Sequence, residues 1–315
     1  MLIPYFDAHC DTITEEKGLF RNGLAVDLAL EQFAPRAQVF AVYGDLDIHT
    51  MEGRFDRAVS ALTDLCRENK TLAFCRSAEE VRKAARKGQT AALLSVEGAE
   101  VLNCSPERLE QAAKQGLIMT GITWNHANLL SGSCVEAPER GLTELGRQYV
   151  QTATRLGVAL DISHLSPKGA QQVIELASGR VLASHSNAYS LCPHPRNLTD
   201  DQFRALALSG GVTGINLYTP FLTEDDRKIR SNQTEALASV IAHIRHFVSL
   251  TPLGTKPIVL GCDFDGCDLL PAGLTKSKDM GKLYFALLDA GFTKQEVDGI
   301  FYENLLRFLQ QSGKA

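Results

Sequence analysis

An apolar run that ends in ligand-type side chains opens the sequence: Tyr5-Phe6-Asp7-Ala8-His9-Cys10-Asp11-Thr12. In an extended strand, residues i and i+2 point to the same face, so His9 and Asp11 would place an imidazole beside a carboxylate. Cys10 would point to the opposite face, into core packing. The pair suits one divalent metal ion but cannot complete its coordination, so other ligands must come from elsewhere in the chain.

Similar apolar runs recur along the chain, and helical patterns separate them. Most of the runs are continuously apolar, as expected of strands that are buried on both faces of a parallel sheet. The eight runs cover residues 5–9, 37–43, 91–96, 117–124, 158–162, 181–184, 212–217 and 258–262. Several helices between them have recognisable starts. Ser105 and Ser166 each precede a proline, the pattern of an N-cap followed by the first helical position, and Thr199 with Gln202 fits a capping box.

Eight strand candidates that alternate with helices predict a (β/α)8 TIM barrel, built as a single domain from residues 1–315. No composition break or low-complexity stretch indicates a linker. An open doubly wound sheet is the alternative. Nucleotide-binding proteins of that class carry a glycine-rich turn after the first strand, and no GxGxxG or Walker A pattern is present. In a barrel, the active site lies at the C-terminal ends of the strands.

Composition and charge exclude several classes of partner. The chain is 44% hydrophobic and 22% charged, with a formal net charge of -5, so no basic stripe is available to neutralise nucleic-acid phosphates.

We see no signal peptide, no membrane anchor and no apolar run near the roughly 20 residues that span a bilayer. The eight cysteines are scattered without a CxxC pair, which favours reduced thiols and a cytoplasmic location.

Six of the predicted strands end in histidine, aspartate or glutamate, and in a barrel these strand ends would meet at the mouth. The side chains are those of His9, Asp11, Glu97, His126, Asp161, His164, His185, Asp263 and Asp265. Neutral imidazole and carboxylate groups suit zinc and other borderline divalent ions. A catalytic zinc site with an open position uses three protein ligands, so this set exceeds the needs of one ion.

Two metal ions that share a carboxylate would use five of these residues. His9 and Asp11 could hold one ion, His164 and His185 the other, with Glu97 bridging. Two ions about 3.5–4 Å apart can activate a bridging hydroxide and polarise a carbonyl group. A further carboxylate, Asp263, would then be free to act as general acid and base.

Six motifs occur in a characteristic order along nearly the whole chain. They are Asp7-x-His9-x-Asp11, Val96-Glu97-Gly98, Ser163-His164, Ser184-His185-Ser186, Pro195-Arg196-Asn197 and Gly261-x-Asp263-Phe264-Asp265-Gly266. The set resembles the membrane dipeptidase (renal dipeptidase) family, peptidase family M19. Each motif alone is a weak signal, whereas all of them in order are highly specific. The resemblance implies a TIM barrel that holds two zinc ions through the same five ligands and hydrolyses dipeptides, often with a D-residue on the C-terminal side.

The resemblance also implies roles for residues outside the ligand set. Arg196 would bind the substrate carboxylate, which a guanidinium can pair with through two hydrogen bonds, and Asp263 would transfer protons. The family's substrate-polarising histidine follows Leu-Thr, but here Trp124 follows Thr123, so we assign that role to His126, the nearest histidine. Independently of the resemblance, Tyr218 follows the seventh predicted strand and opens the long polar loop 219–234, so it is expected to line the site. A homodimer is expected at the family level.

Two other functions are compatible with this sequence. One is another binuclear amidohydrolase that acts on a non-peptide amide, such as an N-acyl amino acid or a lactam. Those barrels commonly bridge their metals with a carboxylated lysine, whereas Glu97 occupies that position here and no lysine lies at the strand ends. The other is a non-catalytic barrel, which predicts lost ligands although all five are present.

Three further residues are expected to have structural rather than ligand roles. His243 and His246 lie on the polar side of a predicted helix over 237–247 and should be exposed to solvent. For Asp161, orientation of His164 and a purely structural role fit equally well.

Overall fold

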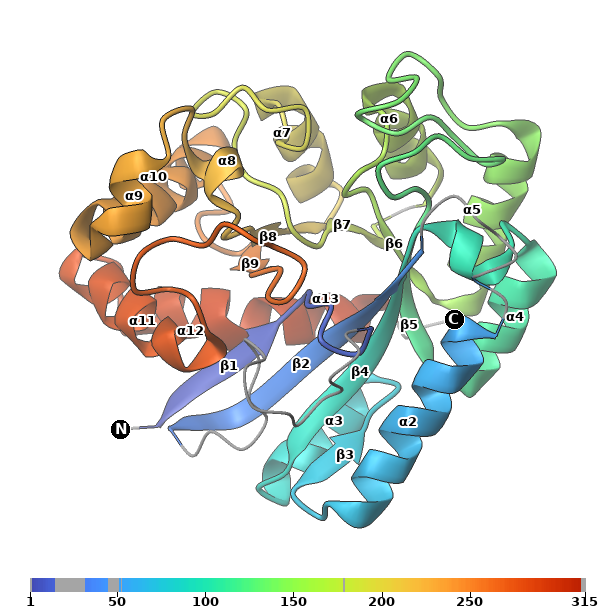
Figure 1. Cartoon of the computed structure of the whole chain (residues 1–315), viewed down its shortest axis with the longest axis horizontal. Coiled ribbons are helices and arrows are strands. Elements are labelled where there is room, and N and C mark those ends of the chain that lie inside the picture. Colours follow the sequence, from blue (N-terminus) through green and yellow to red (C-terminus); the bar gives the residue numbers. More distant parts are fainter. Residues whose placement is uncertain (1, 15–31, 45–50, 52, 178, 313–315) are drawn as a thin grey trace.

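The computed structural model of the chain is a closed ring of parallel strands surrounded by helices (Figure 1). It describes all residues except 1, 15–31, 45–50, 52, 178 and 313–315. The strands are β1 (Ile3–Asp7), β2 (Phe33–Tyr43), β3 (Leu72–Phe74), β4 (Thr90–Glu97), β5 (Leu117–Gly121), β6 (Ala159–Asp161), β7 (Val181–Ala183), β8 (Val212–Ile215) and β9 (Ile258–Leu260).

Strand pairing closes the ring. Neighbours follow the order β2-β1-β9-β8-β7-β6-β5-β4, and β4 pairs again with β2 over Ala91–Glu97. All of these pairings are parallel. The predicted TIM barrel is therefore confirmed, with one strand for each of the eight apolar runs.

The ninth strand, β3, was not predicted. It pairs with the start of β4 at Thr90–Ala92 and stands outside the ring. A strand of three residues, Leu72–Phe74, is too short to stand out as an apolar run, so periodicity could not reveal it. The predicted run 117–124 was too long, because β5 ends at Gly121 and the chain continues as a loop.

Helices cover the outside of the ring (Figure 1). They are α2 (Arg54–Glu68), α3 (Ala78–Arg86), α4 (Pro106–Gln115), α5 (Glu144–Leu156), α6 (Pro167–Leu176), α7 (Asp200–Leu208), α8 (Thr219–Leu222), α9 (Arg227–Ser231), α10 (Gln233–Leu250), α11 (Met280–Asp289), α12 (Lys294–Asp298) and α13 (Asn304–Ser312). Short turns of helix, η1 (Ala99–Leu102), η2 (Ser277–Asp279) and η3 (Gly299–Glu303), complete the set. The predicted caps form. Ser105 and Ser166, each just before a proline, accept the backbone N–H of the residue three positions later, and Thr199 with Gln202 makes a capping box.

Apolar side chains fill the inside of the ring. Phe6, Val39 and Leu93 belong to one buried cluster with Leu305 and Phe308 of α13. This packing leaves the carboxyl ends of the strands as the place where polar side chains can gather. All eight cysteines are free thiols, as predicted. Within the described part of the chain, no helix combines the length and apolar character needed to cross a bilayer.

Candidate metal centre and active site

The five predicted ligands converge at the carboxyl ends of four strands. His9 and Asp11 follow β1, Glu97 ends β4, His164 follows β6, and His185 follows β7. All five side chains are buried. Cys10, which lies between the first two, points away and bonds to the carbonyl of Val39, as strand alternation predicted.

Glu97 lies at the centre of this group and uses its two oxygens differently. Its Oε2 is 3.4 Å from Nε2 of His9. Its Oε1 is 2.8 Å from Nε2 of His164 and 3.3 Å from Nε2 of His185. One carboxylate therefore connects the pair after β1 with the two histidines from β6 and β7, which is the arrangement a bridging ligand requires.

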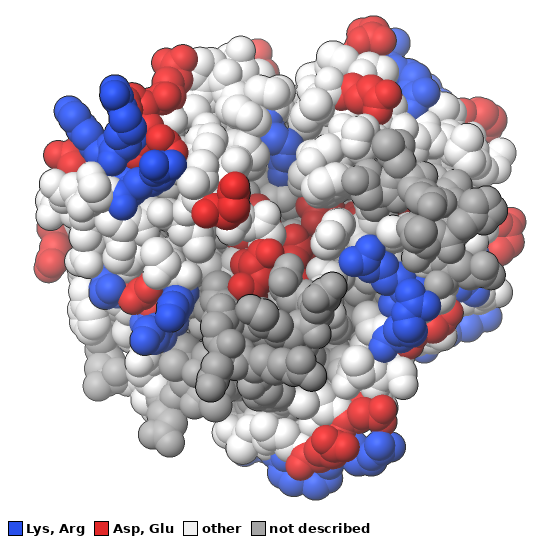
Figure 2. Space-filling view, viewed as in Figure 1, with Lys and Arg blue, Asp and Glu red and all other residues white. Residues whose placement is uncertain are grey.

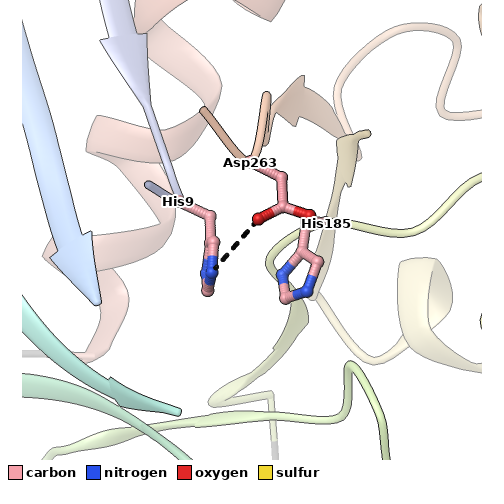
Figure 3. A group of neighbouring side chains, drawn as sticks. All are labelled: His9, His185 and Asp263. Atoms are coloured by element: carbon pink, nitrogen blue, oxygen red, sulfur yellow. Dashed lines mark ion pairs between the residues drawn. The ribbon is translucent and has the colours of Figure 1, made fainter. Parts of the chain in front are cut away.

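Asp263, just after β9, completes the group. Its Oδ1 lies 3.8 Å from Nε2 of His9. Figure 3 shows His9, His185 and Asp263 turned toward a common space from different strand ends. Three sets have ligand atoms within 4.8 Å of one another: His9, Asp11 and Glu97; Glu97, His164 and His185; and His9, His185 and Asp263. His9, His185 and Glu97 each belong to two of these sets, but only the carboxylate of Glu97 has two oxygens with which to bridge, so the geometry fits two cations with a shared carboxylate.

Unpaired buried atoms also fit a metal centre. Nε2 of His9 and Oδ1 of Asp11 are buried without a hydrogen-bond partner among the described residues. The two atoms lie 3.8 Å apart, too far for a hydrogen bond, and coordination of a shared cation would satisfy both. Imidazole and carboxylate donors suit zinc and other borderline ions, but they do not identify the metal.

The electrostatics of the group follow from its burial and crowded charges. Burial lowers the pKa of His9, but the carboxylates of Glu97, Asp11 and Asp263 outweigh it and raise that pKa to about 10. Burial, together with the neighbouring carboxylates, raises the pKa of Asp11. Burial lowers the pKa of both His164 and His185, so these two are neutral imidazoles. A bound proton at His9 thus balances charge that a metal ion would neutralise.

A pocket of about 320 Å³ opens above the group. Its lining consists of Asp11, Tyr43, Glu97, Trp124, Asn125, His164, Arg196, Tyr218, Phe221, Asp263, Asp265, Gly266, Cys267 and Asp268. Arg196 is the one cation among five carboxylates in this lining of described residues. Figure 2 shows acidic side chains near the centre of the face presented in Figure 1, with basic side chains mostly toward its edges.

Arg196 has the features expected of an anion-binding residue. Its side chain is buried, with the guanidinium carbon 5.5 Å from the ring of Phe221. Within the described residues it forms no ion pair, and its Nε has no hydrogen-bond partner. Its one direct hydrogen bond is a long one, 3.5 Å from Nη2 to the carbonyl of His185. Burying a cation with so few partners is costly, so the guanidinium keeps unused hydrogen-bond donors at the pocket.

Sequence reasoning missed a set of buried asparagines that connects Arg196 with Asp263. Asn197, next to Arg196, accepts the N–H of Asn187 at 3.1 Å, and Asn187 in turn accepts the N–H of Asn216 at 3.0 Å. Nδ2 of Asn216 donates to Oδ2 of Asp263 at 3.1 Å, leaving Oδ1 facing His9. Asparagine is too common in loops to carry a sequence signal, so only the contacts reveal this connection.

His126 is not among the residues that line the pocket. Its side chain is 39% exposed, and Nδ1 lies 3.2 Å from Oε2 of Glu136. Trp124 and Asn125 line the pocket instead, and Oδ1 of Asn125 accepts a hydrogen bond from Nδ1 of His164 at 2.9 Å. The role of His126 in polarising a substrate stays a prediction.

The prediction for His243 was wrong. Its ring is buried, accepts the N–H of Ala188 at Nδ1, and donates from Nε2 to the carbonyl of Leu222. Burial lowers its pKa to about 4, so it is neutral. His246 is only partly exposed and pairs with Asp200 at 2.8 Å. Helical periodicity cannot anticipate these three partners, because all of them come from other segments of the chain.

Comparison with known proteins agrees with this geometry. The sequence model of the family described as membrane dipeptidase (peptidase family M19) matches residues 3–315. The chain belongs to peptidase family M19. It is also 31% identical over 245 residues to an uncharacterized protein from the pqqA 5' region of Klebsiella pneumoniae, over 76% of this chain and 88% of that protein. The resemblance seen in the sequence motifs is confirmed, and the chain is an M19 metallopeptidase with a candidate binuclear centre.

Solved structures of similar chains share the fold throughout. A metallopeptidase from Rhodobacter sphaeroides, solved with a phosphinate mimic of the dipeptide L-Ala-D-Ala, is 26% identical with a TM-score of 0.86, over 99% of this chain and 100% of that chain. Dipeptidase AC, a metallopeptidase of family M19, is 28% identical with a TM-score of 0.89 and full coverage of both chains.

Proposed function

We propose that this M19 metallopeptidase is a zinc-dependent dipeptidase that accepts small dipeptides, including those with a D-residue on the C-terminal side. One observation carries the proposal: a single pocket joins a candidate binuclear centre to a buried arginine without an ion-pair partner among the described residues. A dipeptide presents a carbonyl group and a free carboxylate a few bonds apart, so one molecule can reach both. The Rhodobacter sphaeroides relative that holds an L-Ala-D-Ala mimic supports this substrate class.

In this proposal His9 and Asp11 hold one ion, His164 and His185 hold the other, and Glu97 bridges them. Two bound divalent ions would supply an activated water and polarise the peptide carbonyl. The distances from Glu97 to three histidines support these assignments.

The remaining roles belong to the pocket residues. Arg196 binds the substrate carboxylate through its guanidinium, which places the scissile carbonyl over the cluster. Asp263, held by Asn216 through Oδ2, presents Oδ1 to the reacting groups and delivers a proton to the leaving amine. Tyr218 and Phe221 pack edge to face at 4.8 Å and form an apolar wall beside Arg196. A pocket of about 320 Å³ is at the small end of the range for ligand sites, which favours a dipeptide over a longer peptide.

The alternative functions are less well supported. No lysine lines the pocket among the described residues, so nothing there would provide the carboxylated lysine that many other amidohydrolases use. All five candidate ligands converge, whereas a barrel kept only for binding would have no reason to retain them.

Metal analysis combined with a substrate panel tests the proposal. We expect about two zinc ions per chain and turnover of L-Ala-L-Ala and L-Ala-D-Ala. N-acetyl-alanine and the C-terminal amide of Ala-Ala should react far more slowly, because each lacks one charged end of a dipeptide. Full metal occupancy with turnover of the N-acyl compound but not the dipeptides would refute the proposal and favour another amidohydrolase.

A further inference from the structure

One hydroxyl group lies behind two of the candidate metal ligands. Oγ of Ser184, at the end of β7, is 2.6 Å from Nδ1 of His185 and 3.2 Å from Nδ1 of His9. It also forms a short hydrogen bond with Oδ2 of Asp161. All four side chains are buried, so these contacts are shielded from water.

The proton positions in this group follow from the number of donors and acceptors. Oδ1 of Asp161 accepts hydrogen bonds from the backbone N–H groups of Ser163 and Ser184, each at 2.9 Å. These two bonds fix the orientation of the carboxylate and leave Oδ2 facing the Ser184 hydroxyl. A carboxylate oxygen accepts only, and a serine hydroxyl has one proton and two lone pairs. The Ser184 proton therefore goes to Asp161, and both lone pairs accept. The hydroxyl of Ser163 is a distant third candidate at 3.5 Å, and the two nearer donors are Nδ1–H of His185 at 2.6 Å and Nδ1–H of His9 at 3.2 Å.

The opposite arrangement is unfavourable. If Ser184 donated its proton to His185, its oxygen would face Oδ2 of Asp161 lone pair to lone pair at short distance. Asp161 could not relieve this repulsion by turning, because two backbone N–H groups hold Oδ1.

We propose that Ser184, oriented by Asp161, is a positioning residue that fixes His9 and His185 in the Nδ1–H tautomer and so prepares one ligand for each of two metal ions. The proposal rests on the metal centre described above. Once His9 has lost its extra proton to metal binding, both Nε2 atoms are free to coordinate, and they lie 3.4 Å (His9) and 3.3 Å (His185) from the Glu97 carboxylate. Because the two histidines serve different ions, one hydroxyl supports both halves of the centre.

His164 provides an internal comparison. Its Nδ1 donates to Oδ1 of Asn125, which has no contact with Ser184 or Asp161 among the described residues. Its tautomer should therefore be independent of the Ser184–Asp161 pair.

Two variants separate this role from simple packing. In Asp161→Asn, the amide oxygen must stay on the two backbone N–H groups, so the new NH2 group donates to Ser184. Ser184 then gives its own proton to a histidine, and His185 is the nearer one. The His185 proton moves to Nε2, where it blocks coordination. Ser184→Ala removes the shared acceptor without reversing any hydrogen bond, so both histidines lose orientation but neither is blocked.

Ser186→Ala is the matched control. Ser186 is in the same motif and equally buried, but its Oγ has no hydrogen-bond partner among the described residues. This variant should bind metal as the parent protein does.

The experiment combines zinc competition titrations with 15N NMR of histidine side chains in the zinc-loaded full-length chain. We expect zinc on Nε2 and a proton on Nδ1 for His9 and His185 in the parent protein. Ser184→Ala should weaken both sites, by roughly 10- to 100-fold, the usual effect of removing such outer partners. Asp161→Asn should weaken the His164/His185 site more than Ser184→Ala does, although it removes no ligand and no hydroxyl.

Other results would overturn the inference. Coordination of zinc by Nδ1 of His9 or His185 would do so. Unchanged zinc affinity at both sites of Ser184→Ala would also do so, and so would an equal loss of zinc affinity at both sites of Asp161→Asn. If Asp161→Asn does not fold, the NMR assignment and Ser184→Ala still decide. If the parent protein does not bind two ions, the metal centre itself is refuted. If both histidines have the expected tautomer but dipeptides are not hydrolysed, only the proposed substrate is refuted.

Discussion

Metal binding should expel a proton from His9. In the metal-free protein the carboxylates of Glu97, Asp11 and Asp263 outweigh burial and raise the His9 pKa from 6.5 to about 10, so the ring is an imidazolium at pH 7. A metal ion can bind Nε2 only after that proton has left. His164 differs, because burial lowers its pKa and it has no excess proton to lose at the same pH.

The size of this competition follows from the pKa. A pKa of about 10 lies about three above pH 7, so removing the His9 proton at pH 7 costs about 4 kcal/mol, at 1.36 kcal/mol for each pKa unit. Apparent metal affinity at pH 7 should thus be about a thousandfold weaker than when His9 is fully deprotonated, rising about tenfold per pH unit until the pH approaches the pKa. The stability of the metal-free protein changes in the opposite direction: this raised pKa stabilises the metal-free fold fully below about pH 6.5, and the contribution disappears as the pH rises through about 10.

Calorimetric titration with zinc at pH 7, in buffers with different ionisation enthalpies, counts the protons released. The variant His9→Gln should release about one proton fewer than the parent protein, whereas the matched variant His164→Gln should release the same number. Protons lost from metal-associated water are common to both variants and cancel in the comparison. Equal release from the two variants, or an affinity that does not change with pH, would show that His9 is not protonated as reasoned.

Three further predictions concern the substrate, the chemistry and the barrel wall. Arg196→Ala should reduce kcat/KM for dipeptides by roughly 30-fold or more, about 2–5 kcal/mol for a buried charge pair, with little change for C-terminal amides; equal losses for both would exclude carboxylate binding. Asp263→Asn should keep both ions by elemental analysis but lose about 10²–10⁴ in kcat, and full activity would remove its proton-transfer role. Gly261→Ala would place Cβ 1.8 Å from the carbonyl oxygen of Ser184, so urea unfolding should show a loss of about 3 kcal/mol or more; the control Gly254→Ala, which has open space around it, should lose only about 1–2 kcal/mol from its left-handed backbone.

The candidate ligands could be predicted because their positions follow from local rules. A buried parallel strand shows itself as an apolar run, and a barrel brings the carboxyl ends of all its strands together. His9, Glu97 and His185 could therefore be placed in one site although they lie far apart in sequence. Once β5 ends at Gly121 no such rule applies, because the path of the following loop determines which side chain faces the pocket. Trp124 and Asn125 line the pocket and His126 does not, contrary to what proximity in sequence suggested.

The sequence by itself determined the fold class, the family and the set of candidate ligands, since each of these is encoded in short patterns of residue type and order. Only the tertiary structure decided which atom of each ligand faces the centre and which residues hold it there. Ser184 and His9 are 175 positions apart, and Asn216 and Asp263 are 47 apart. Serine and asparagine acquire these roles only when the barrel closes, because a neutral polar side chain has no signal of its own until a buried partner needs its hydrogen bond.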